Sequence, residues 1–274
     1  IRKPKPKNVV KLSEEQTRNY EGNKDLFYRS LNRSLREEAI FIQGADLEEK
    51  KVSVAVASSK YMSFSRIAGR SARIVSALSP ESIEKINLHV MNGDFEIAVV
   101  SVDKENLDKA NEYEISNNEL LTQTEFLSKT NKPFYKSSEF KPSVNFPEFD
   151  WTMSPGLKHQ IGGPEAFYLG QLYWRTDTTL KIARGLSLYT TLGFDIYNNF
   201  NQFNNPSYST IPHVRSDIQD YLKEGKNNLA RMQLEYMYSP RKDWFMRFDI
   251  GYLEEMFGGF GGEILYRPFN KSFE

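Results

Sequence analysis

Two hydrophobic patterns divide the chain. Between residues 24 and 111, apolar positions recur at helical spacing and then at every second residue. From residue 167 onward, apolar positions alternate with small or polar ones over long stretches, which is the period of strands whose two faces meet different surroundings. The pattern predicts an α+β chain, with a small α/β domain followed by antiparallel strands.

The small domain is expected to be a sandwich of helices on one face of a sheet. Leu26, Phe27, Leu31 and Leu35 predict its first helix, and Asn92-Gly93-Asp94 predicts a hairpin turn. The other expected elements are strands at 39–43 and 51–57, a helix at 61–78, and strands at 85–91 and 95–102. The chain is thereby divided into a polar tail or linker at 1–24, an α/β domain at 25–111, a connector at 112–166 and a strand segment at 167–274.

The clearest strand pair covers residues 229–238 and 244–252. Met232, Leu234 and Tyr236 share one face of the first strand, and Arg231 and Glu235 share the opposite face. Strands of about this length cross a bilayer when they are tilted. The strands are therefore candidates for a transmembrane β-barrel.

A half-buried sheet in a soluble protein would produce the same alternation. Aromatic residues gathered near strand ends favour the barrel, because such girdles lie at the membrane interface. They are Tyr236, Tyr238 and Trp244 around one turn, and Tyr168, Tyr173 and Trp174 elsewhere. We expect a long loop at 198–228, and an incomplete barrel, because about eight strands are needed for closure.

Composition narrows the classes of function. Lys+Arg and Asp+Glu both number 36, so no net charge favours binding to nucleic acid. There is no cysteine and no apolar run of about 18 residues, which excludes disulfides, thiolate metal sites and transmembrane helices. The first residues lack the apolar core of a signal peptide, and we expect the sequence to be a piece of a longer chain.

Arg66, Arg70 and Arg73 form a basic stripe on the predicted helix at 61–78. The stripe is either a solvated helix face or a contact for an anionic polysaccharide or a partner protein, because arginine binds carboxylates through two hydrogen bonds.

His213, Arg215 and Asp217 form a second polar group, within the expected long loop. They make either a salt bridge in the loop or a polar patch inside a barrel, where they would guide a charged polymer.

Three acidic residues could suggest a glycosidase, because that chemistry uses a pair of carboxylates. Glu254, Glu255 and Glu263 flank a glycine-rich stretch, where we expect them to be solvated or to face a lumen. No catalytic residue is assigned, and the chain is expected not to be an enzyme.

Gly258, Gly259, Gly261 and Gly262 are predicted to form a structural turn, because glycine permits positive φ and close backbone approach. Their spacing does not match a phosphate-binding loop, and no cofactor is expected. His89, His159 and His213 lie far apart with no carboxylate at ligand spacing, so no metal site is expected either.

Four runs resemble the YjbH family of outer-membrane exopolysaccharide and capsule biosynthesis proteins. The most specific is YLEEMFGGFGGEILYRPF at 252–269, and the others are AGRSARI at 68–74, GGP at 162–164 and IPHVRSD at 211–217. The resemblance implies a bacterial outer-membrane protein with barrel segments and a periplasmic region, here residues 25–111. Full members of the family are much longer, so missing chain segments or another subunit would have to complete the barrel.

The resulting hypothesis is an outer-membrane β-barrel protein, in contact with lipid, that acts in export or assembly of an extracellular polysaccharide as a pore or docking platform. Other envelope export proteins are expected partners. Two alternatives stay open: a soluble β-rich module that binds or hydrolyses carbohydrate, and a structural component of a larger cell-envelope complex.

Overall fold

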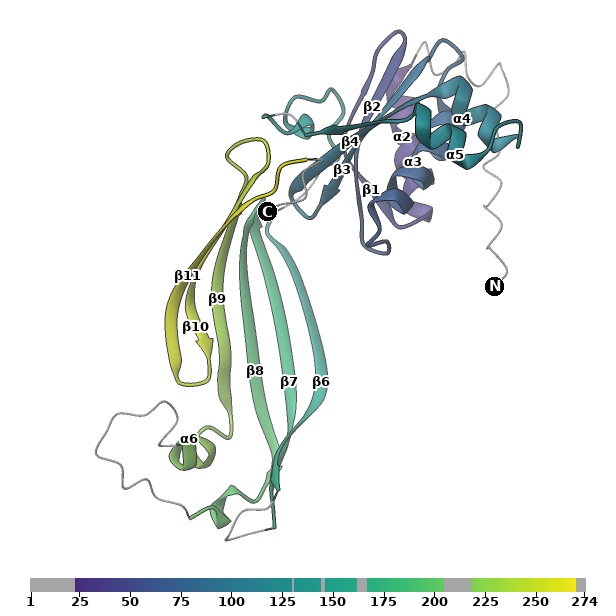
Figure 1. Cartoon of the computed structure of the whole chain (residues 1–274). Helices are drawn as coiled ribbons and strands as arrows, with labels where there is room; N and C mark the ends of the chain where they lie inside the picture. Colours follow the sequence, from purple (N-terminus) through teal and green to yellow (C-terminus); the bar gives the residue numbers. More distant parts are fainter. Residues whose placement is uncertain (1–22, 130, 144–145, 162–166, 205–217, 270–274) are drawn as a thin grey trace. The chain divides into compact units, whose positions relative to one another are not determined.

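The computed structural model describes residues 23–129, 131–143, 146–161, 167–204 and 218–269 (Figure 1). The chain is divided into two compact units. The first comprises Ile1–Val144, Ser239–Phe245 and Tyr266–Glu274, and the second comprises Asn145–Tyr238 and Met246–Leu265. The described residues form two sheets with helices, which confirms the mixed α/β class.

The first unit contains a five-stranded sheet in the order β1-β2-β3-β4-β5. Strands β2 and β3 are parallel because α3 crosses between them, and the other neighbours are antiparallel. The strands are β1 (Ile40–Leu47), β2 (Lys51–Ser58), β3 (Lys85–Asn92), β4 (Phe95–Asp103) and β5 (Glu125–Ser128). The helices are α2 (Lys24–Glu37), α3 (Phe64–Leu78), α4 (Lys104–Asn111) and α5 (Asn117–Gln123).

Helix α2 is held in place at its start and along its apolar stripe. The Asn23 side chain accepts a hydrogen bond from the amide of Leu26 at 3.3 Å and caps the helix. Phe27, Leu31 and Leu35 are fully buried in the core that α2 and α3 form with the sheet. The hydroxyl of Tyr28, on the same helix, accepts a hydrogen bond from the amide of Leu47 at 2.9 Å and so ties the helix to β1.

The 3₁₀-helix η1 (Phe134–Lys136) packs against His89 and Glu96 on the other face of this sheet. The ring of Phe134 stacks on His89 of β3 with ring centroids 4.2 Å apart. Its amide donates to Glu96 of β4 at 2.8 Å.

Most elements predicted for the small domain are confirmed, including both helices and the hairpin between β3 and β4. Two features differ. The strand predicted at 39–43 does not end there but continues through Gly44 to Leu47, with an irregularity in its pairing with β2 between Ile42 and Gly44. The expected connector at 112–166 contains α5, β5, η1 and the whole of a long strand, β6.

The second sheet has six strands in the order β11-β10-β9-β8-β7-β6 (Figure 1). Each strand pairs in antiparallel orientation with the strand that follows it in the sequence. The strands are β6 (Glu148–Ile161), β7 (Tyr168–Ala183), β8 (Leu186–Asn198), β9 (Asn228–Tyr238), β10 (Trp244–Glu254) and β11 (Phe257–Tyr266). The predicted pair at 229–238 and 244–252 is confirmed as β9 and β10. Over the described residues the sheet is open, and β6 and β11 form its edges.

Strand β6 was missed by the sequence analysis although it has 14 residues. Phe149, Trp151 and Met153 alternate with polar residues, but Pro155 and Gly156 interrupt the pattern, and both residues are poor strand formers. Pairing with β7 along the whole strand overrides this local preference.

The predicted loop at 198–228 contains η2 (Phe200–Gln202) and α6 (Ile218–Glu224). None of the helices in the described part of the chain is long and apolar enough to span a membrane.

Tyr28→Phe is expected to loosen β1 within the first unit. The amide of Leu47 would lose its buried acceptor, which costs about 1–3 kcal/mol. Hydrogen exchange of the Leu47 amide in the full chain should accelerate accordingly. Tyr113→Phe removes a hydroxyl from a side chain that is 84% exposed and serves as the control. Equal exchange rates in both variants would contradict the anchoring role.

Candidate functional site

The register of the second sheet separates its side chains into two unlike faces. In β6, Phe149, Trp151 and Met153 lie on one face, and their partners in β7 extend that face across the sheet. We call this the apolar face. Its large exposed side chains within the second unit are Phe149, Trp151, Met153, Leu157, Ile161, Tyr168, Leu172, Trp174, Phe194, Tyr197, Leu229, Met232, Leu234, Tyr236, Tyr238, Phe248, Ile250, Phe260 and Ile264.

The opposite side, which we call the polar face, carries most of the charged residues of the strands. They are Glu148, Asp150, Lys158, Arg175, Asp177, Lys181, Asp195, Arg231, Glu235, Arg247, Asp249 and Glu263.

Burial on β9 is the reverse of that in a water-soluble sheet. Gln233 and Glu235, on the polar face, expose only 7% and 8% of their surface. Their neighbours Leu234 and Tyr236, on the apolar face, expose 36% and 44%. In a soluble half-buried sheet the apolar residues would be the sheltered ones.

Ion pairs within the polar face match its charges with one another across neighbouring strands. Arg247 lies within 4.0 Å of Glu235, 3.9 Å of Asp249 and 3.5 Å of Glu263, so it links three neighbouring strands. Lys181 pairs with Glu148 across β7 and β6 at 3.2 Å. The polar face therefore balances much of its own charge.

A cavity of about 460 Å³ opens on the polar face near one end of the sheet. Side chains from β7, β8, β9 and β10 line it, together with the turn between β10 and β11. The pairing of β7 with β8 shifts register at Leu172/Tyr173, and that of β8 with β9 shifts at Thr191/Leu192. Such irregularities redirect side chains, and here they do so at the cavity wall.

Tyr173 was predicted to belong to an interfacial girdle, but this assignment is wrong. It pairs with Gly156, whose neighbours Pro155 and Leu157 are on the apolar face, so Tyr173 lies on the polar face and lines the cavity. The sequence analysis lacked β6 and therefore had no partner strand with which to fix the face of Tyr173.

The four glycines do not form the predicted turn. Gly258, Gly259, Gly261 and Gly262 lie within β11, and the turn is at Glu255 and Met256. The need for glycine at position 261 is explained by the close approach of Asp249. A Cβ on Gly261 would lie 2.9 Å from the carboxylate oxygens of Asp249.

The acidic residues weighed for catalysis make ionic contacts. Glu255 forms an ion pair with Lys158 and accepts a hydrogen bond from Asn228 at 2.9 Å. Glu263 pairs with Arg247, and Glu254 lines the cavity beside Glu255.

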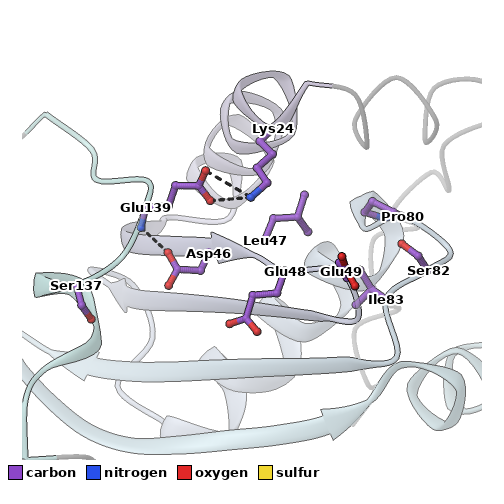
Figure 2. A pocket seen from close by; sticks show the side chains of 10 residues that line it. All are labelled: Lys24, Asp46, Leu47, Glu48, Glu49, Pro80, Ser82, Ile83, Ser137 and Glu139. Carbon is purple, nitrogen blue, oxygen red and sulfur yellow. Dashed lines mark hydrogen bonds and ion pairs between the residues drawn. The ribbon is translucent and has the colours of Figure 1, made fainter.

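The first unit has a cavity of about 770 Å³ beside the β1–β2 hairpin (Figure 2). Asp46, Glu48, Glu49 and Glu139 give it an acidic wall, and Lys24 is its basic residue. Figure 2 shows Lys24 reaching Glu139, at 3.1 Å.

Two pKa values reflect these contacts. The hydrogen bond from Lys24 lowers the pKa of the Glu139 carboxyl, and Tyr28 also donates to it at 3.0 Å. Burial, followed by the hydrogen bond to Glu139, raises the pKa of Tyr28. Because the pKa of Glu139 is lowered, the stability that these bonds supply is present at neutral pH and is lost as the pH falls through that lowered pKa.

The three arginines of the basic stripe on α3 have different surroundings. Arg70 donates to Glu38 at 2.6 Å and lies over the ring of Tyr61, 4.8 Å from its centroid. Arg66 is exposed and Arg73 is half-buried. Contact of the stripe with a polymer or partner stays a prediction for all three arginines, and Arg70 has a structural role as well.

The other predicted residues are only partly described. His213, Arg215 and Asp217 lie outside the described residues. His89, expected to have no carboxylate nearby, lies 2.9 Å from the buried Glu96, because the β3–β4 hairpin brings them together. Burial lowers the pKa of Lys129, an effect that Glu96 partly offsets.

In the part of the chain that the structure describes, no group of three or more His, Cys, Asp or Glu residues could hold a metal ion.

Comparisons with known proteins give one consistent relationship. The family model for YjbH, described as "Exopolysaccharide biosynthesis protein YbjH", matches residues 2–274. A protein of Escherichia coli (strain K12) named "Uncharacterized lipoprotein YjbH" is 36% identical over 133 residues. That match covers 45% of this chain and 18% of the E. coli protein. No solved structure matches the chain.

Arg70→Ala is expected to destabilise the first unit, because the Glu38 carboxylate would lose its ion pair with Arg70 at a site where the Glu38 side chain is only 14% exposed. Arg66→Ala is expected to change the free energy of unfolding by less than about 0.5 kcal/mol, as is usual for exposed positions. Hydrogen exchange of β1 and α3 amides would measure both effects. A similar response in the two variants would contradict the structural role of Arg70.

Proposed function

The chain belongs to the YjbH family, and from this premise we propose that it is an outer-membrane β-barrel protein that serves exopolysaccharide export or assembly as a pore or docking platform. The observation that carries the proposal is the sheet with an exposed apolar face on one side and a face of mutually paired charges on the other, with Gln233 and Glu235 of that polar face buried. A bilayer would cover the first, and an aqueous lumen would lie against the second.

The dimensions of the apolar face support this function. On β8, Leu186 pairs with the aromatic Tyr236 of β9 near one end of the strand, and Phe194 pairs with Trp174 of β7 near the other end. From Leu186 to Phe194 the strand rises roughly 26 Å along its own axis, at about 3.3 Å per residue, which at a strand tilt of about 40° spans roughly 20 Å of the bilayer. The apolar band of outer-membrane barrels is about 25 Å tall and is flanked by aromatic residues, as this one is.

The open edges of the sheet require further strands. Backbone N–H and C=O groups cannot remain unpaired in hydrocarbon, so β6 and β11 would each need a neighbour in a membrane. Six strands are also fewer than the roughly eight that close a small barrel. We therefore propose that additional segments of a longer chain, or another subunit, complete the wall.

The family and the relative support an envelope location. The family description names exopolysaccharide biosynthesis, and the E. coli relative is named a lipoprotein. We extend an envelope location to this chain, with the first unit in the periplasm. The proposed role is passive and requires no catalytic residue or cofactor.

A matched pair of substitutions on β6 tests membrane insertion. Met153 on the apolar face and Thr152 on the polar face are adjacent and both exposed. A soluble sheet would tolerate lysine at either position. In a bilayer, Met153→Lys should cost about 2–4 kcal/mol near the midplane, and Thr152→Lys should cost little.

The measurement is the fraction of full-length protein that inserts into vesicles and resists extraction by carbonate. We expect Met153→Lys to lower that fraction and Thr152→Lys to leave it at the level of the unmodified protein. Equal insertion of both variants, or a protein that stays monodisperse in buffer without detergent, would contradict the proposal and favour the soluble carbohydrate-binding alternative.

A further inference from the structure

We infer that the cavity on the polar face is a binding subsite for an uncharged sugar unit of the polysaccharide. This inference rests on the proposed function, because it places the polymer on the polar face. The cavity volume of about 460 Å³ lies within the range of about 300–1,000 Å³ for small-ligand pockets.

Tyr173 provides an aromatic wall. Its ring lies against Gly156 of the neighbouring strand, where a Cβ would come within 2.5 Å of the ring. Gly193, on the other neighbouring strand, would place a Cβ 3.5 Å from the same ring. Because glycines lie on both sides, the backbone of the neighbouring strands approaches the Tyr173 ring closely and fixes its position. Aromatic side chains commonly pack over strand glycines in this way. A fixed aromatic ring offers an apolar surface to the C–H groups of a sugar at little entropic cost.

Two arginines provide hydrogen-bond donors around that ring. Arg175 is held by Asp177 through bonds of 2.8 and 3.0 Å, and Arg231 is held by Gln233. A guanidinium has five N–H donors, and the two bonds from Arg175 to Asp177 use two of them. Both side chains line the cavity, so their other donors can reach hydroxyl groups there.

The charge balance of the wall favours an uncharged ligand. The cavity wall carries Arg175 and Arg231 together with Glu254 and Glu255, and Glu255 is itself paired with Lys158. Asp177 further neutralises Arg175, and its carboxylate also accepts from Thr191 at 2.7 Å. An anionic sugar would gain little attraction from these arginines and would meet two carboxylates. A neutral sugar, with many hydroxyls that donate and accept, fits a wall that offers both signs of charge.

The test uses the full chain in detergent micelles and a panel of defined hexasaccharides. The panel contains neutral glucose and galactose oligomers together with an oligogalacturonate of the same length. Titration calorimetry would measure each dissociation constant. We expect a neutral oligomer to bind more tightly than the oligogalacturonate.

Three variants locate the binding. Tyr173→Ala removes the ring and should weaken binding of the neutral oligomer at least about tenfold, whereas Tyr173→Phe keeps the ring and should bind within about twofold of the unmodified protein. Ala230→Phe fills the cavity from β9 without removing any polar group, and it should also abolish binding. It serves as the second route if Tyr173→Ala disturbs packing against Gly156.

Neutral binding that Tyr173→Ala and Ala230→Phe leave unchanged would overturn the inference, as would tighter binding of the oligogalacturonate or no binding by any member of the panel. Vesicle insertion of the same preparations separates this failure from that of the proposed function. A protein that inserts normally but fails these binding tests refutes the subsite alone, and one that does not insert refutes the function.

Discussion

Backbone pairing between neighbouring strands is the constraint on which the second sheet depends. Each of the six strands joins the next, and pairing across β6 and β7 runs the full length of β6. Because side chains alternate along every strand, this register decides which residues share a face. The two unlike faces and the cavity on one of them follow from that register. The expected need for more strands follows from the strand order, which leaves β6 and β11 at the edges.

The sequence predicted the strands whose alternation is unbroken and missed those that depend on a partner. Residues 229–252 were recognised because Met232, Leu234 and Tyr236 alternate with the polar residues Arg231, Gln233 and Glu235 without interruption. Strand β6 was missed because Pro155 and Gly156 break its local pattern, and β5, with only four residues, forms by pairing with β4. The glycines at 258–262 were assigned to a turn from composition, although β10 holds them in an extended strand.

The candidate sites show the same limit. The spacing of Arg66, Arg70 and Arg73 predicted a shared helix face, but only the fold reveals that Arg70 reaches Glu38 from another element. Similarly, His89 and Glu96 lie seven residues apart, a spacing that means nothing until a hairpin joins them. The cavity around Tyr173 draws on four strands, so no local motif could have indicated it.

Accessibility along β6 tests the central claim most directly. The chain contains no cysteine, so single cysteines introduced along β6, at 149–154, 157 and 158, can carry spin labels without background labelling. In vesicles, we predict that relaxation by oxygen, which concentrates in lipid, is high at 149, 151, 153 and 157, and that relaxation by a water-soluble nickel chelate is high at 150, 152, 154 and 158. Equal access of the nickel chelate to both sets of positions would contradict a lipid-facing apolar side.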